Sequence, residues 1–147
     1  MTQQKGLYND VIMDHIKNAR NFHALDNATS QAKGVNPLCG DTFTVYLRAA
    51  SDRIEEASFQ CECCGISMAS ASIMTETVRG KSFAEAKTLF RRFEDLLRRA
   101  GSESSEASEE FAVLQLIREF PSRVNCALLA WKTLDAALEG RSEVEIA

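Results

Sequence analysis

Apolar residues recur at helical spacing in five segments of the chain. The segments are residues 7–19, 66–79, 83–99, 111–120 and 126–138. The second is rich in Ser, Ala and Met and has apolar positions on every side, which indicates a buried helix with close neighbours. Gly80 ends it, and Ser82 with Glu85 forms a capping box for the helix that follows.

Two other segments alternate between apolar and polar residues and are rich in β-branched and aromatic side chains. Residues 42–47 and 54–59 are separated by a polar turn at 50–53. This pattern predicts an antiparallel hairpin. A short edge strand is expected near residues 30–35.

The chain has 147 residues, which is the usual size of one domain. One compact domain is therefore expected over 1–147. The Ser- and Glu-rich segment 101–108 is typical of a mobile linker inside such a domain. Residues 141–147 are expected to form a frayed tail.

Charge and hydropathy exclude several classes of function. The formal net charge is −4, whereas a domain that binds nucleic acid is normally basic, so no nucleic-acid partner is expected. No run of about 18 apolar residues indicates a membrane span. The first residues lack the apolar core of a secretion signal, which predicts a cytoplasmic protein whose cysteines stay reduced.

The five cysteines carry the strongest chemical signal. Cys61, Cys63 and Cys64 lie within four positions, whereas Cys39 and Cys126 stand alone. In a reducing compartment, a clustered and odd-numbered set is more often metal-binding or catalytic than a disulfide framework. Metal or sulfur chemistry is therefore favoured over structural bridging.

The hairpin predicts where some of these residues meet. The entry of its first strand and the exit of its second are neighbours, so Cys39 and Asp41 are expected near the cluster at Cys61 and Cys64. Cys64 and Cys126 each open a predicted helix, whose free N–H groups favour a thiolate. Three thiolates and a carboxylate suit tetrahedral zinc, and the same sulfurs suit an iron-sulfur cluster.

Each signal also has a simpler interpretation. Cys126, beside an apolar helix face, can be a core cysteine. Arg123 is either a surface residue or a positive charge that holds thiolates anionic. His15 lies on the first predicted helix without nearby ligand-type residues and is expected to be a packed or exposed histidine; His23 carries equally little signal.

Three motifs in the same order resemble those of the U-type iron-sulfur cluster assembly proteins, and the first predicted helix is similar too. The motifs are Asn36-Pro37-x-Cys39-Gly40-Asp41, Cys64-x-Ile66-Ser67-x-Ala69-Ser70-x-Ser72-x-Met74-Thr75 and Phe120-Pro121-x-Arg123-x-x-Cys126-x-Leu128-x-x-Trp131. The resemblance covers residues 7–138. It is greatest to the SufU branch, because the segment 81–118 is long and Asn125 replaces the histidine that precedes the last cysteine in the IscU branch.

The resemblance implies a single-domain α+β fold in which a small three-stranded antiparallel sheet packs against several helices. It implies a site with Cys39, Asp41, Cys64 and Cys126 as metal ligands and Arg123 beside them. The metal implied is zinc, with a [2Fe-2S] cluster or iron bound transiently. The implied partners are a pyridoxal-phosphate cysteine desulfurase of the SufS type and downstream cluster carriers or apo-proteins.

The chain departs from the family pattern at Cys61 and Cys63, where glycines two positions apart are usual. Glycines there suggest backbone freedom, so the loop before Cys64 is expected to differ. The replacements place two extra thiols beside the site. They are candidates for alternative metal ligands or for a persulfide relay.

Three functions compete at this point. The first is a sulfur acceptor, in which Cys39 or Cys126 takes persulfide sulfur from the desulfurase and passes it into cluster assembly, rather than a stand-alone enzyme. The second is a scaffold on which a [2Fe-2S] cluster is built and transferred. The third is a zinc-stabilised interaction module. The missing histidine favours the first over the second, and Asp41, a hard and easily displaced ligand, argues against the third.

Overall fold

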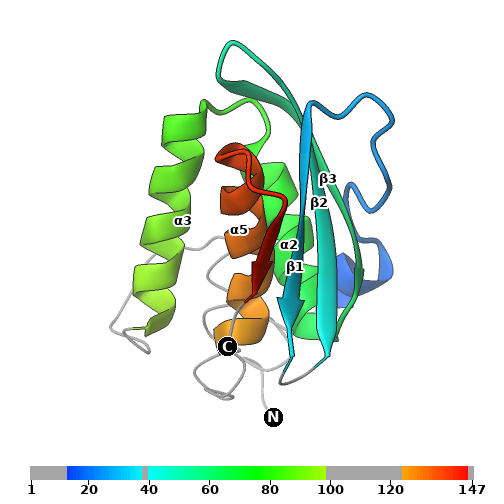
Figure 1. The fold of residues 1–147 in the computed structure, drawn as a ribbon. Helices are drawn as coiled ribbons and strands as arrows, with labels where there is room; N and C mark the ends of the chain where they lie inside the picture. Colours follow the sequence, from blue (N-terminus) through cyan, green and yellow to red (C-terminus); the bar gives the residue numbers. More distant parts are fainter. Residues whose placement is uncertain (1–12, 38–39, 99–123, 146–147) are drawn as a thin grey trace.

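The computed structural model of the chain describes residues 13–37, 40–98 and 124–145. In these residues, four strands form one mixed sheet against which three long helices are layered (Figure 1). The strands are β1 (Ser30–Asn36), β2 (Asp41–Ala50), β3 (Arg53–Glu62) and β4 (Glu143–Glu145). Their order in the sheet is β3-β2-β1-β4.

The expected α+β fold is confirmed, but the expected three-stranded antiparallel sheet is wrong. Strands β1, β2 and β3 are antiparallel, whereas β4 runs parallel to β1 with Gly34 opposite Val144. The fourth strand comes from residues 141–147, which were expected to be a frayed tail. Its three residues contain a single apolar side chain, Val144, so the segment is too short to show an alternating pattern.

The hairpin of β2 and β3 follows the alternation in the sequence. Phe43, Val45 and Leu47 point inward and are fully buried, while the residues between them are more exposed. At the turn, Ser51 and Asp52 both have positive φ angles, of 53° and 64°. This backbone suits a two-residue turn whose twist matches that of the strands.

The helices are α2 (Gly65–Val78), α3 (Phe83–Arg98) and α5 (Val124–Leu138). Helices α2 and α5 cover one face of the sheet, and α3 packs on the far side of α5 (Figure 1). Residues 13–17 are helical and are the described part of the first predicted helix. The predicted helix 111–120 and linker 101–108 lie outside the described residues.

Small residues let α5 approach both the sheet and α2. A Cβ atom at Gly34 of β1 would collide with the Thr133 hydroxyl, so glycine is needed for α5 to lie this close to the strand. Between the helices, the buried Ser70 hydroxyl donates a 2.7 Å hydrogen bond to the carbonyl of Ala127. These contacts hold α5 against both β1 and α2.

Helix α3 is attached to α5 by an aromatic contact and by an ion pair. Phe90 and Phe93 lie against Trp131, with ring centroids 6.3 and 5.3 Å apart. Lys87 donates to the carboxylates of Asp135 at 2.8 Å and Glu139 at 2.9 Å. None of the helices in the described ranges is long and apolar enough to cross a membrane.

Candidate metal centre

The first residue of β2, Asp41, supplies a buried carboxylate at the open end of the hairpin. It pairs with Asn36 across the β1–β2 ladder, and the Gly40 amide closes the connection by donating to the Asn36 carbonyl at 2.8 Å. The inward alternation of β2 puts Asp41 on the same face as Phe43, where it is 5% exposed. An acidic side chain in a core position needs polar partners or a cation, because burying an isolated charge is costly.

Cys64 is the residue at which α2 begins. It occupies the N-cap position with an extended backbone, and its side chain makes no capping hydrogen bond. The first N–H groups of a helix have no partner within the helix and carry partial positive charge. The half-buried sulfur of Cys64 therefore lies at the end of α2 that carries these N–H groups.

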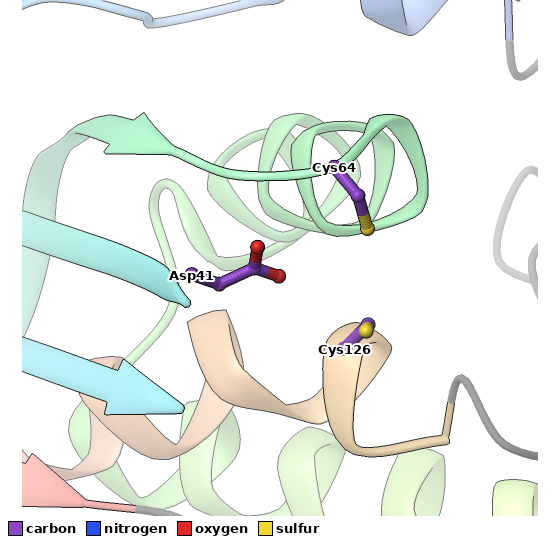
Figure 2. Close-up of side chains that lie close together, drawn as sticks. All are labelled: Asp41, Cys64 and Cys126. Carbon is purple, nitrogen blue, oxygen red and sulfur yellow. The ribbon is translucent and has the colours of Figure 1, made fainter. Parts of the chain in front are cut away.

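Cys126 lies in the first turn of α5 and is 5% exposed. Two helix N-termini thus meet at the end of the hairpin, each with a cysteine. Figure 2 shows the carboxylate of Asp41 and the sulfur atoms of Cys64 and Cys126 turned toward one another. Their ligand atoms all lie within 4.8 Å of each other.

This donor set fits a zinc ion. A tetrahedral zinc, with bonds of about 2.0–2.3 Å, holds its ligand atoms about 3.3–3.8 Å apart, so small side-chain rotations close the observed arrangement. Two thiolates and a carboxylate carry three negative charges, and the two helix N-termini offset the excess over the charge of the metal. The described residues supply three of the four positions of a tetrahedral site.

Ser67 is a site residue whose role sequence reasoning missed. Its fully buried hydroxyl lies 2.7 Å from Oδ2 of Asp41, 3.4 Å from Sγ of Cys64 and 3.0 Å from the carbonyl oxygen of Cys126. It thus touches all three residues of the group. The signal in the sequence was its position three residues after Cys64, which puts both side chains on one side of α2.

Two of the predicted site residues, Cys39 and Arg123, lie outside the described residues. Cys39 belongs to the connection between β1 and β2, two positions before Asp41. Arg123 directly precedes the first residue of α5. Their predicted roles, as ligand and as neighbouring charge, stay predictions.

The expectation of free thiols at Cys61 and Cys63 is wrong for this structure, because the two form a disulfide with each other. Their Cα atoms are 5.6 Å apart; Cys61 belongs to β3, and Cys63 directly follows the last residue of that strand, Glu62. In this form neither sulfur is available as a metal ligand. Among the described residues, Cys64 and Cys126 are the cysteines that are not in a disulfide.

His15 is a packed histidine, as expected. It is fully buried, and its Nδ1 atom is 2.7 Å from the Ser72 hydroxyl of α2, which also accepts a hydrogen bond from the Arg20 amide. It is not part of the group formed by Asp41, Cys64 and Cys126. The exposed His23 bonds its neighbour's carbonyl, at Ala24.

Comparison with known proteins connects this geometry to a family. The pattern of the family described as "NifU-like N terminal domain" matches residues 7–142. The chain is 38% identical over 129 residues to the zinc-dependent sulfurtransferase SufU of Bacillus subtilis, covering 88% of this chain and 87% of that protein. It is 33% identical to the iron-sulfur cluster assembly scaffold protein IscU of Thermotoga maritima, covering 92% and 94% of the two chains.

Solved structures agree on the fold. The SUF-system protein FiSufU of Fervidobacterium islandicum superimposes with a TM-score of 0.80 at 30% identity, over 92% of this chain and 99% of that one. The N-terminal part of a NifU-like protein from Brucella abortus also gives 0.80, at 20% identity, over 94% and 96%. The second likeness bears on the fold alone.

Proposed function

Because the chain belongs to the family of NifU-like N-terminal domains, we propose that it is an iron-sulfur cluster assembly protein that accepts sulfur from a cysteine desulfurase. The sulfur arrives as a persulfide at a zinc-binding site made of Cys39, Asp41, Cys64 and Cys126. The protein acts as a sulfur acceptor for the desulfurase and not as an enzyme with its own complete reaction.

One observation carries this proposal. A buried carboxylate and two cysteine sulfurs, from three separate segments, lie within 4.8 Å of one another at two helix N-termini. A site built only for stability would use ligands that hold zinc tightly, such as four thiolates. Asp41 is instead a hard oxygen ligand beside soft sulfurs, which is the weakest and most exchangeable member of such a set.

When bound, zinc keeps the cysteines deprotonated and compensates the repulsion between the anionic side chains. The protein's own residues would hold the ligands in place. Ser67 holds Oδ2 of Asp41 and thereby orients the carboxylate. The N-termini of α2 and α5 carry partial positive charge at Cys64 and Cys126, which would favour negatively charged ligands there.

The transfer itself is a thiol exchange. A thiolate of this chain, at Cys126 or Cys39, attacks the outer sulfur of the desulfurase persulfide. The bond between the two desulfurase sulfurs breaks, the desulfurase cysteine leaves as a thiolate, and the sulfur atom stays on this chain as a new persulfide. Cys126 lies in the first turn of α5, and Cys39 is two positions before Asp41 in the sequence, which supports these two cysteines as the candidate acceptors.

The partner implied by this chemistry is a pyridoxal-phosphate cysteine desulfurase of the SufS type, because that class of enzyme forms a persulfide from free cysteine. Downstream, the sulfur passes to a cluster carrier or an apo-protein. The support for these partners is the similarity to a protein named as a zinc-dependent sulfurtransferase and to one named as a cluster assembly scaffold.

A second candidate function is that of a scaffold on which a [2Fe-2S] cluster is built. The observation that favours it is the 33% identity to a scaffold protein over nearly the whole chain, together with a donor set whose sulfurs also suit iron. Against it, Asn125 stands directly before Cys126, where that branch carries a histidine.

The test combines metal analysis with sulfur loading on one sample. The zinc-loaded protein is incubated with the desulfurase and cysteine under argon, and intact mass spectrometry counts the sulfur atoms added. We expect Cys39→Ser and Cys126→Ser together to abolish loading. The control Thr77→Ala, which lies on α2 at the end away from Cys64, should load normally.

Two results would contradict the proposal. The first is a double variant that still accepts sulfur from the desulfurase as the unchanged protein does. The second is anaerobic incubation with iron and sulfide that yields a stable visible chromophore transferable to an apo-protein, with no loading by the desulfurase. The second result would establish the scaffold function instead.

A further inference from the structure

The disulfide of Cys61 and Cys63 lies close to the candidate metal centre. Along the chain, Cys63 directly precedes Cys64. Across the sheet, the last pair of the β2–β3 ladder is Thr42 with Glu62, the residues that directly follow Asp41 and directly precede Cys63. The pair is thus built into the strand end that carries the candidate metal centre.

A structural role does not account for this bond. The loop closed between Cys61 and Cys63 contains one residue, Glu62, so the cross-link removes little entropy from the unfolded chain. Strand β3 is already held by its ladder with β2 as far as the pair of Thr42 and Glu62. The bond therefore adds little to what the hairpin provides, which points to a chemical role.

The two sulfurs differ in their surroundings. Cys61 lines an open groove of about 820 Å³ on the sheet, together with Phe22, Thr42 and Gln60. Cys63 is half-buried between Glu62 and Cys64 and is not among the residues that line this groove. Both residues are half-buried; Cys61 is the one that faces the groove, and Cys63 is the one next to Cys64 in the chain.

We propose that Cys61 and Cys63 form a redox pair that reduces the sulfur accepted at the neighbouring site to sulfide. This inference rests on the proposed function, because it needs a persulfide at the site. It assigns the pair a task that the acceptor reaction leaves open: persulfide sulfur is at oxidation level zero, whereas the sulfur of a cluster is sulfide, two electrons lower. The disulfide between Cys61 and Cys63 is the oxidised form of such a pair.

The reaction proceeds in two exchanges and balances within the chain. The Cys63 thiolate attacks the outer sulfur of the persulfide on Cys39 or Cys126, takes that sulfur and releases the site cysteine as a thiolate. The Cys61 thiolate then attacks the Cys63 sulfur, forms the disulfide and expels hydrosulfide. One persulfide and two thiols become one thiol, one disulfide and one molecule of hydrogen sulfide.

The cycle closes when an external dithiol reduces the disulfide. A dithiol of the thioredoxin class attacks the Cys61 sulfur from the groove, breaks the bond to Cys63 and leaves as its own disulfide. Two electrons and two protons return to the pair. The reduced state is the one expected in a reducing compartment, and the disulfide is the state after one turnover.

The test is a single turnover without added reductant. The full-length, zinc-loaded protein is first reduced, then freed of reductant, loaded by the desulfurase and followed under argon. Released sulfide is measured colorimetrically, and the disulfide is detected by mass after alkylation of free thiols. We expect one sulfide per chain, appearing together with one Cys61–Cys63 disulfide.

The two single variants locate the sulfur at different stages. With Cys63→Ser, sulfide release should fall to background while the added sulfur remains on Cys39 or Cys126. With Cys61→Ser, sulfide release should also fall, but the added sulfur should accumulate on Cys63. Trypsin separates these cases, because Cys63 lies in the peptide 54–79 and the site cysteines Cys39 and Cys126 lie in other peptides; fragment spectra then distinguish Cys63 from Cys64.

The possible results separate this inference from the proposed function. If the unchanged protein accepts no sulfur, both fail. If it loads sulfur and both variants release sulfide as it does, only the redox role of the pair fails. The unchanged protein also gives a test that does not depend on variants that fold: sulfide release while Cys61 and Cys63 remain fully reduced would overturn the proposal.

Discussion

The hydroxyl of Ser67 lies 2.7 Å from the carboxylate of Asp41, and this contact joins the first turn of α2 to the start of β2. The two residues are 26 positions apart in the chain. Since the same hydroxyl also touches Sγ of Cys64, it holds the carboxylate at a fixed place relative to a sulfur ligand. The candidate centre is therefore oriented by a group that is not itself part of the predicted ligand set.

Replacing Ser67 by alanine should loosen the centre. The Asp41 carboxylate would lose a buried hydrogen bond worth about 1–3 kcal/mol, and loss of such a supporting contact typically weakens metal binding about 10–100-fold. Zinc affinity measured with a competing chelator should fall by this factor. The matched control is Ser70→Ala, which removes a buried hydroxyl from the same helix. That hydroxyl donates to the carbonyl of Ala127 and does not contact a candidate ligand.

These two variants should therefore differ in zinc affinity while resembling each other in stability. Equal zinc affinity in Ser67→Ala and Ser70→Ala would show that the contact with Asp41 does not position a ligand.

Asp41→Asn should have a larger effect on the metal than Ser67→Ala. Asparagine keeps the size of the side chain and an oxygen that accepts from Ser67, but it removes the negative charge that binds a dication. We expect faster zinc release to a chelator, followed by absorbance, and little change in the thermal unfolding of the metal-free protein. The control is Asp26→Asn, at an exposed position away from the sheet. Identical release rates for the two variants would exclude Asp41 as a ligand.

The sequence predicted those parts of the centre that depend on local pattern. The alternation of 42–47 and 54–59 indicates a hairpin, and a hairpin brings its two open ends together, so Asp41 and Cys64 were expected to be close. The structure has both in one group of ligand atoms. The capping box at the start of α3 is also confirmed by reciprocal bonds between Ser82 and Glu85.

The remaining features depend on contacts between distant segments. The place of Cys126 follows from the way α5 packs on Gly34 and Ser70, which no local pattern encodes. Strand β4 exists because residues 143–145 find an unpaired edge of β1. The disulfide of Cys61 and Cys63 was not predicted, because the expected compartment favours free thiols.

Gly34→Ala should destabilise the fold through α5. The added methyl group would collide with the Thr133 hydroxyl, and forcing extra volume into a packed core costs about 1–3 kcal/mol. Urea unfolding should show this loss with an unchanged slope. In a Thr133→Ala background the colliding oxygen is absent, so the cost of Gly34→Ala should be smaller. Additive costs in the double variant would contradict the contact.

The attachment of α3 to α5 through Lys87 should depend on pH. Burial alone would lower the pKa of Lys87, but its hydrogen bonds to Asp135 and Glu139 outweigh burial and raise that pKa above 10.5. The bond from Lys87 in turn lowers the pKa of Glu139 below 4.5. The ion pair therefore stabilises the fold fully between these two values, and it weakens as Glu139 is protonated in acid or Lys87 loses its proton in base.

The expected result is a stability difference between the unchanged protein and Lys87→Met that is largest near neutral pH. Thermal unfolding at a series of pH values measures it. The difference should shrink as the pH falls below 4.5, since a protonated Glu139 no longer attracts the ammonium group. The control Lys33→Met removes an exposed lysine from β1 and should give a difference that does not follow this profile. A Lys87→Met difference that stays constant from neutral to acid pH would show that the pair contributes packing and no charge interaction.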